Sequence, residues 1–187
     1  MDTHVLPRAQ SGLITPSYRA MQAELHASRP DYGVASTAFA PLVSRVVKQL
    51  GVRELLDYGA GKGRLGQSLA GEHGEALVVH HYDPAIEAWS ADPEPREMVA
   101  CIDVLEHIEP ECLDPVLDDL RRVTRRVGFF TIHTGPAAKV LSDGRNAHLI
   151  QKPSKWWLER IAKRFSVVHL SEYEQGFCVI VAPLPAA

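Results

Sequence analysis

The chain has 187 residues, of which 45% are hydrophobic and 23% charged, and its formal net charge is −3 at pH 7. This size and balance fit one globular domain and exclude two large lobes. With this net charge the protein has no overall positive field that would attract polyanions such as nucleic acids. Neither a membrane span nor a secretory signal is recognisable in the sequence. We therefore expect a cytoplasmic protein, a monomer or homodimer, whose partner is a small molecule and neither a nucleic acid nor a membrane.

The N-terminal part of the chain predicts two helices. The first residues are polar and rich in turn formers, which is typical of a loosely held arm. Apolar residues at helical spacing predict helices over residues 17–27 and 36–50. We divide the chain into an N-terminal arm with a lid helix, residues 1–35, and a main domain, residues 36–187.

Strands and helices alternate along the main domain. Strands are expected at residues 54–58, 77–82, 98–104 and 128–133, helices at 64–70, 113–126 and 154–165, and a closing antiparallel pair at 167–170 and 177–181. This alternation predicts an α/β fold, with a doubly wound, mostly parallel sheet and a C-terminal antiparallel hairpin. Ligands on such sheets bind at the carboxyl ends of the strands.

A glycine-rich turn follows the first expected strand, in the sequence LLDYGAGKG over residues 55–63. Gly59, Gly61 and Gly63 provide a backbone that can take positive φ angles and approach a ligand closely. The run predicts a buried strand, a tight turn that admits a ligand, and the start of a helix. A G-x-G-x-x-G motif can also be written from Gly61 to Gly66, so the spacing leaves a dinucleotide open.

Acidic residues lie at the ends of three expected strands, namely Asp57, Asp83 and Asp103. Asp83 comes 22 residues after Gly61. A carboxylate at that distance in a βαβ unit can accept hydrogen bonds from both hydroxyls of a ribose. The sequence therefore predicts a nucleoside-binding site at this edge of the sheet.

Three segments, in this order along the chain, resemble the motifs of class I S-adenosylmethionine-dependent methyltransferases. They are ELLDYGAGKG at residues 54–63, YDP at 82–84 and DVLEHI at 103–108. The resemblance implies a Rossmann-like fold of seven strands with the last antiparallel, and S-adenosyl-L-methionine as cofactor. It implies that the methionine portion lies at the first motif, the ribose at the second and the adenine next to Ile86. The implied cofactor-binding residues are Asp57, Gly59, Ala60, Gly61, Gly63, Asp83, Pro84, Ile86, Asp103 and Val104.

One stretch departs from the family pattern. Only 19 residues separate Asp83 from Asp103, where the family usually has a helix, a third strand and an acidic adenine contact. Three prolines make most of this stretch read as loop, so we expect the third strand to be short or absent. Trp89, Ser90 and Asp92 could replace the adenine contact, or Trp89 could be a packing residue.

Glu106, His107 and His133 are the candidate catalytic residues. A base is needed only if the methyl acceptor must lose a proton, and a histidine with a pKa near neutrality suits that role. The alternative is a structural role, with His107 capping a helix and His133 bonded within its loop. The group Asp103, Glu106 and His107 also resembles an element that binds a divalent ion in ubiquinone-pathway O-methyltransferases and in enzymes that methylate small-RNA 3′ ends, but we expect no metal here.

The substrate side is expected in a polar loop after the fourth strand. Arg145, Asn146 and His148 are candidate substrate contacts there, because loops on rigid scaffolds often carry recognition. Tyr32, in the N-terminal segment, could fold over the site. The alternative is an ordinary connection in which His148 packs under the next helix.

These features favour a methyltransferase that transfers a methyl group from S-adenosylmethionine to an oxygen or nitrogen of a small molecule or sugar-like acceptor. Two other functions remain open at this point. One is a non-catalytic S-adenosylmethionine-binding protein, which the shortened stretch before Asp103 would allow. The other is a NAD-dependent oxidoreductase, against which stands the lack of a second domain for substrate.

Overall fold

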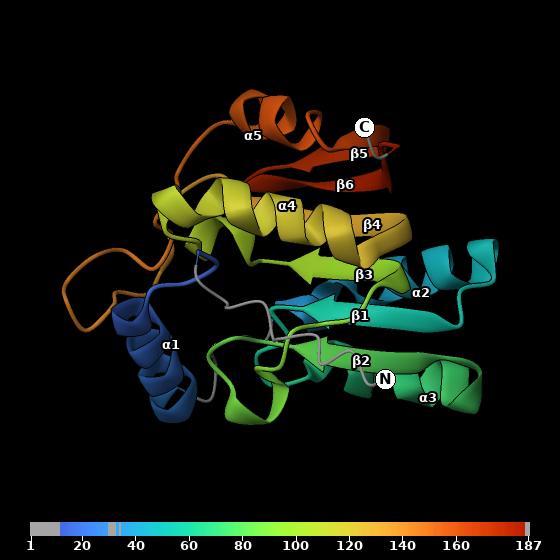
Figure 1. Cartoon of the computed structure of the whole chain (residues 1–187), viewed down its shortest axis with the longest axis horizontal. Helices are drawn as coiled ribbons and strands as arrows, with labels where there is room; N and C mark the ends of the chain where they lie inside the picture. Colours follow the sequence, from blue (N-terminus) through green and yellow to red (C-terminus); the bar gives the residue numbers. More distant parts are fainter. Residues whose placement is uncertain (1–11, 30–32, 34, 186–187) are drawn as a thin grey trace, which may run out of the picture.

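A six-stranded sheet runs through the centre of the computed structural model, which describes residues 12–29, 33 and 35–185 (Figure 1). Its order is β2–β1–β3–β4–β6–β5, with β1 to β4 parallel and β6 antiparallel to both β4 and β5. The strands are β1 Glu54–Tyr58, β2 Val78–Tyr82, β3 Arg96–Ile102, β4 Thr124–His133, β5 Phe165–Tyr173 and β6 Gly176–Pro183. The predicted α/β sheet with its C-terminal antiparallel hairpin is confirmed.

Helices cover both faces of this sheet. They are α1 Pro16–Ser28, α2 Ser36–Leu50, α3 Arg64–His73, α4 Leu113–Val123 and α5 Ser154–Ile161, with short 3-10 turns at Gly74–Ala76, Glu87–Trp89, Leu105–His107 and Pro110–Cys112. In Figure 1, α4 lies in front of the sheet, α2 and α3 lie behind it, and α1 stands beyond the ends at which β1, β2 and β3 finish. None of the described helices combines the length and the apolar character needed to cross a bilayer.

Two buried clusters hold these layers together, one on each face of the sheet. Successive residues of a strand point to opposite faces, so Leu55 packs with Val43 of α2 and Leu65 of α3. Its neighbour Leu56 packs in the cluster that contains Leu117 of α4. Both faces of β1 are therefore covered, which explains why the adjacent residues Leu55 and Leu56 are both apolar.

The connection between β2 and β3 contains no strand. Among the described residues, the 3-10 turn Glu87–Trp89 is its only regular element, and β2 forms the edge of the sheet. The expectation that the third strand is short or absent is confirmed, and the sheet has six strands instead of the seven that the resemblance implied. The carboxyl end of β2 therefore lies at the edge of the sheet, next to β1 alone.

Several predicted boundaries are wrong by a few residues; for example, α3 runs to residue 73 rather than 70, and β4 begins at residue 124 rather than 128. The helix expected to reach residue 126 ends at Val123, because Thr124 turns to an extended conformation and pairs with Arg96 of β3. The hydroxyl of Thr124 donates to the Leu120 carbonyl and closes the helix. Similarly, α5 ends at residue 161 rather than 165, and β3 ends at residue 102 rather than 104.

Gly59→Ala should destabilise the fold by roughly 2–4 kcal/mol. Gly59 has φ +78°, and a Cβ there would lie 2.4 Å from Cγ2 of Val104, a stiff β-branched neighbour. Gly71→Ala is the matched control, because Gly71 lies exposed in α3 with no atom within 4 Å of an added Cβ. That change should stabilise by about 0.5–1 kcal/mol. Urea unfolding measures both, and a Gly59→Ala variant as stable as the wild type would contradict the left-handed turn.

Candidate active site

A cleft of about 590 Å³ lies where the parallel strands end, between those ends and α1. Its lining includes residues from the loops after β1, β2, β3 and β4, as the doubly wound sheet predicts. Ten of the residues singled out in the sequence line it: Gly59, Ala60, Gly61, Asp83, Pro84, Asp103, Val104, His107, His133 and His148. The strand ends therefore bring the glycine turn, two carboxylates and three histidines to one cavity.

The glycine turn forms one wall of the cleft. The amides of Gly59 and Ala60 both donate to the Tyr82 carbonyl, at 2.8 and 3.0 Å, which ties the turn to the end of β2. Gly61 has φ +51°, and a Cβ there would lie 3.1 Å from Cε1 of His26 in α1. Two positions of this turn are thus restricted to glycine by backbone angle and by close contact.

Asp83 links the turn to the next strand. Its buried carboxylate accepts the Gly61 amide at Oδ2, 2.8 Å, and the Ala85 amide at Oδ1, 2.9 Å. A buried carboxylate is stable only with such donors around it. Each carboxylate oxygen has two acceptor sites, so both oxygens keep capacity for a hydroxyl in the cleft.

Three of the expected cofactor residues lie outside the cleft lining. Asp57 is buried and lies 3.6 Å from Nδ1 of His81 on β2, and burial raises the pKa of its carboxyl. Gly63 precedes α3 with φ +64°, and a Cβ on it would lie 2.9 Å from the Trp89 ring. The Ile86 amide donates to the Asp83 carbonyl within the turn after β2. These residues support the shape of the loops that line the cleft.

A carboxylate and two imidazoles converge on the other side of the cleft. One ligand atom each from Asp103, His107 and His148 lie within 4.8 Å of one another. Nδ1 of His107 is 2.9 Å from the Ala147 carbonyl, and Nδ1 of His148 is 2.8 Å from the Gly135 carbonyl. A carbonyl oxygen can only accept, so Nδ1 carries the proton in both rings and Nε2 of the neutral ring is an acceptor.

Both imidazoles are neutral near pH 7. Burial lowers the pKa of His107 to about 4, and it also lowers the pKa of His148. The two ring centroids are 4.7 Å apart, so a charge on one ring would further disfavour a charge on the other. The cleft therefore presents two neutral nitrogen acceptors beside a carboxylate.

Asp103 is held in an uncommon backbone conformation. Its φ is +59°, in the left-handed region that non-glycine residues seldom adopt. Its amide donates to Oγ1 of Thr131 on β4 at 3.1 Å, so the neighbouring strand fixes the turn. Strain of this kind costs about 1–3 kcal/mol and is concentrated at functional sites.

Glu106 and His133 are tied into the framework. Glu106 is fully buried, does not line the cleft, and accepts the His133 amide at Oε1, 2.5 Å. Burial and the nearby charge of Asp103 raise the pKa of Glu106. The His133 ring contacts Gly135 through Nδ1 and the Gln175 amide oxygen through Nε2, at 3.2 Å. Glu106 therefore holds the backbone of His133, and the His133 ring makes loop contacts while also lining the cleft.

The expected substrate residues have different positions. His148 lines the cleft. Asn146 accepts the Ala137 and His148 amides with its side-chain oxygen, both at 2.9 Å, and so shapes the loop that carries His148. Arg145 pairs with Asp143 at 2.7 Å outside the cleft lining. Tyr32 lies outside the described residues.

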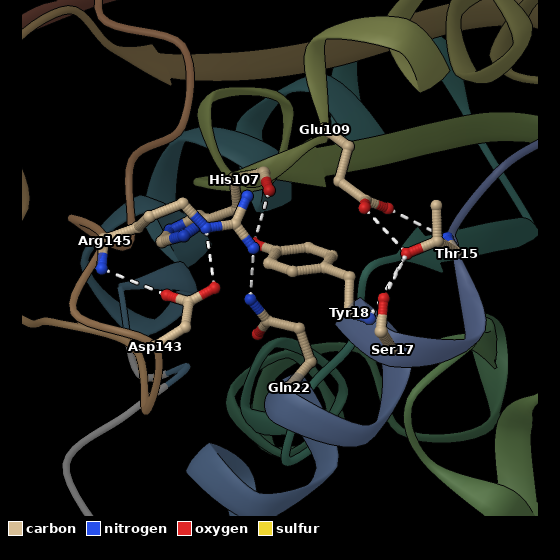
Figure 2. Close-up of polar contacts among 8 residues, drawn as sticks. All are labelled: Thr15, Ser17, Tyr18, Gln22, His107, Glu109, Asp143 and Arg145. Atoms are coloured by element: carbon tan, nitrogen blue, oxygen red, sulfur yellow. Dashed lines mark hydrogen bonds and ion pairs between the residues drawn. The ribbon is translucent and has the colours of Figure 1, made fainter.

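Helix α1 is docked over the cleft by polar contacts that sequence reasoning missed (Figure 2). The Tyr18 hydroxyl donates to the His107 carbonyl at 2.5 Å, and Gln22 donates to the same hydroxyl at 2.6 Å. The amide and hydroxyl of Thr15 donate to the Glu109 carboxylate, at 2.8 and 2.7 Å. Tyr18 and Gln22 also line the cleft. Helical spacing of apolar residues predicts α1 itself, but no local pattern indicates where it docks.

Comparisons with known proteins give the class of the fold. No protein-family model matches the chain, and no curated protein matches it. Among solved structures, the chain is similar to the 1,6-didemethyltoxoflavin-N1-methyltransferase of Burkholderia thailandensis, which was crystallised with 1,6-didemethyltoxoflavin and S-adenosylhomocysteine. The TM-score is 0.64 at 17% identity, over 89% of this chain and 87% of that one.

Two further solved structures are similar to this chain over most of its length. The magnesium protoporphyrin IX methyltransferase of Synechocystis PCC 6803 with bound SAM has a TM-score of 0.61 at 13% identity, over 89% of this chain and 97% of that one. The DhpI–SAH complex has a TM-score of 0.56 at 19% identity, over 91% and 95% of the two chains. The fold is therefore that of the class I S-adenosylmethionine-dependent methyltransferases.

Asp57→Asn should change how the free energy of unfolding depends on pH. The raised pKa of Asp57 means that the folded state binds this proton more tightly than the unfolded chain, so ionisation above about pH 4 lowers stability. Asparagine does not ionise, so the variant should gain stability relative to the wild type as the pH rises, until Asp57 is fully ionised. Urea unfolding at a series of pH values measures the difference. The exposed Asp92→Asn control should run parallel to the wild type, and an Asp57→Asn curve that also runs parallel contradicts the raised pKa.

Proposed function

We propose that this protein is an S-adenosylmethionine-dependent methyltransferase that acts on an oxygen or nitrogen of a small-molecule or sugar-like acceptor. The observation that carries the proposal is the contact of Asp83 with Gly61, which joins a glycine turn and a buried carboxylate at neighbouring strand ends inside one cleft. The fold adds support, because similar structures of this fold were crystallised with SAM or S-adenosylhomocysteine.

The cleft residues fit this cofactor. Bare backbone at Gly59 and Gly61 allows close approach; a Cβ would lie 2.4 Å from Val104 at the first position and 3.1 Å from His26 at the second. Asp83 keeps acceptor capacity for two ribose hydroxyls while it holds the turn. The cofactor-binding residues in this proposal are Gly59, Ala60, Gly61, Asp83, Pro84, Asp103 and Val104, with Asp57, Gly63 and Ile86 shaping the loops that carry them.

Methyl transfer from S-adenosylmethionine requires the protein mainly to orient donor and acceptor. S-adenosylmethionine supplies an activated methyl group when bound, so the protein has to align the acceptor and exclude water. The turn at Gly61 and the carboxylate of Asp83 fix the donor side of the cleft. On the other side, the neutral nitrogens of His107 and His148 can accept a proton from a hydroxyl or amine.

A small acceptor fits the dimensions of the site. The volume of about 590 Å³ has to hold both donor and acceptor, and it lies in the range of small-molecule pockets. Helix α1 contributes Tyr18, Gln22 and His26 to the wall, so we propose that this helix, which belongs to the arm expected at residues 1–35, covers the domain formed by residues 36–187. Cytoplasmic location and a monomeric or homodimeric state stay predictions.

Asp83→Asn should weaken binding of S-adenosylhomocysteine roughly 10- to 150-fold, because hydrogen bonds to a charged group contribute about 1.5–3 kcal/mol. Isothermal titration calorimetry of the wild type with S-adenosylmethionine, S-adenosylhomocysteine and NAD measures the affinities. Asp92→Asn is the control, since Asp92 is an exposed carboxyl outside the cleft lining, and it should bind like the wild type. Thermal unfolding checks that both variants fold. Unchanged affinity in Asp83→Asn refutes the ribose assignment, and binding of NAD alone refutes the proposed function in favour of an oxidoreductase.

Catalysis is tested separately from binding. Incubation with S-adenosylmethionine and a mixed metabolite extract should produce compounds heavier by one methyl group, which mass spectrometry detects. The Asp83→Asn variant under the same conditions gives the background. Tight cofactor binding without any methylated product would instead indicate a non-catalytic binding protein.

A further inference from the structure

We propose that Asp103, His107 and His148 bind one divalent transition-metal ion in the cleft. Their ligand atoms lie within 4.8 Å of one another, and all three residues line the cavity. They come from two segments: Asp103 directly follows β3 and His107 ends the 3-10 turn after it, whereas His148 belongs to the long loop after β4. This proposal departs from the sequence-based expectation that the site holds no metal.

The hydrogen bonds of the two rings prepare them as ligands. Because Nδ1 of His107 donates to the Ala147 carbonyl and Nδ1 of His148 to the Gly135 carbonyl, each neutral ring has its lone pair on Nε2. Metal-binding histidines characteristically donate their other nitrogen to a carbonyl or carboxylate in this way, which fixes the tautomer and the ring orientation. Two rings with this arrangement beside one carboxylate form a donor set rather than a chance grouping.

The separation of the groups is compatible with one ion. Bonds of about 2.1 Å allow at most about 4.2 Å between two ligands of one ion, and about 3.4 Å when the ligands are tetrahedral neighbours. The ligand atoms, at no more than 4.8 Å, therefore need to close by roughly an ångström. Rotation of the Asp103 side chain, together with small shifts of the two rings within their hydrogen bonds, can supply a movement of this size.

The loop that carries His148 is built to hold that ring in place. The Asn146 side chain accepts the amides of Ala137 and His148 and donates to the Ala137 carbonyl at 2.8 Å, so it clamps the two sides of the loop together. The Ala147 amide donates to the Lys139 carbonyl at 3.0 Å. Ala147 is fully buried, and His148 is buried as well. A buried, cross-linked loop of this kind holds the backbone of His148 in place.

The donor set indicates which ions would bind. Imidazole suits zinc, iron, nickel, cobalt and copper, whereas magnesium and calcium prefer oxygen ligands alone. Three protein ligands leave further positions open, as in catalytic metal sites. On the proposed function, an oxygen-bearing acceptor would take such an open position and lose its proton more easily there. Metal binding itself does not depend on that function.

The test is a titration of chelator-treated, full-length protein with Co²⁺, followed by visible absorption and by calorimetry. The wild type should bind one equivalent with a visible d–d spectrum. His148→Asn and Asp103→Asn should each weaken binding at least about tenfold, since even outer-shell substitutions cost 10- to 100-fold in metal affinity. His169→Gln is the matched control, because His169 is exposed on β5 and lies outside the cleft lining, and it should bind like the wild type.

Two outcomes would overturn the proposal: no saturable binding of Co²⁺, Mn²⁺ or Zn²⁺ by the wild type, or full binding retained by both cleft variants. Circular dichroism checks folding, and the use of two variants from different segments guards against a local folding defect. Titration of the same metal-free wild type with S-adenosylhomocysteine separates the two proposals. If S-adenosylhomocysteine binds and metal does not, the metal site alone is refuted. If metal binds and S-adenosylhomocysteine does not, the proposed function alone is refuted.

Discussion

The hydrogen bond from the Gly61 amide to the Asp83 carboxylate is the contact on which the cleft depends. It joins the turn after β1 to the end of β2, and the same carboxylate orders the following turn through the Ala85 amide. A buried charge requires these donors, and the turn requires positive φ at Gly59 and Gly61 to present one of them. The need to satisfy the buried Asp83 carboxylate therefore explains both the glycines of the turn and the position of Asp83 at the end of β2.

The number of nitrogen lone pairs on His107 and His148 limits what these two residues can bind. An imidazole whose Nδ1 donates to a carbonyl has one acceptor left, and that acceptor can bind a proton or a metal ion but not both. His107 therefore cannot serve as general base and as metal ligand at the same time. The His133 ring is engaged with Gly135 and Gln175. An ion in the cleft would make a separate protein base unnecessary for an acceptor bound to it.

The parts of the site that the sequence predicts are those encoded within one βαβ unit. Gly61 and Asp83 belong to such a unit, and their placement on the cleft follows from the strand–turn–helix pattern. Asp57 belongs to the same motif, yet strand alternation turns it away from the cleft toward His81, so the motif alone does not give its direction. His107 and His148 meet because the long loop after β4 brings His148 back to the turn after β3. The spacing of residues along the chain does not predict this contact.

Boundaries between elements were predictable where the amino-acid composition changes abruptly. They were less predictable where the spacing of apolar residues continues from a helix into the next strand. The prolines between β2 and β3 correctly indicated a missing strand, whereas α4 and β4 meet without a break in their apolar pattern. Trp89 shows how the shortened stretch is accommodated. Its ring lies 4.7 Å from the His81 ring, its carbonyl accepts the Asp83 amide, and it limits the space at Gly63. Trp89 thus packs against the end of β2, which carries Asp83, and lies outside the cleft lining.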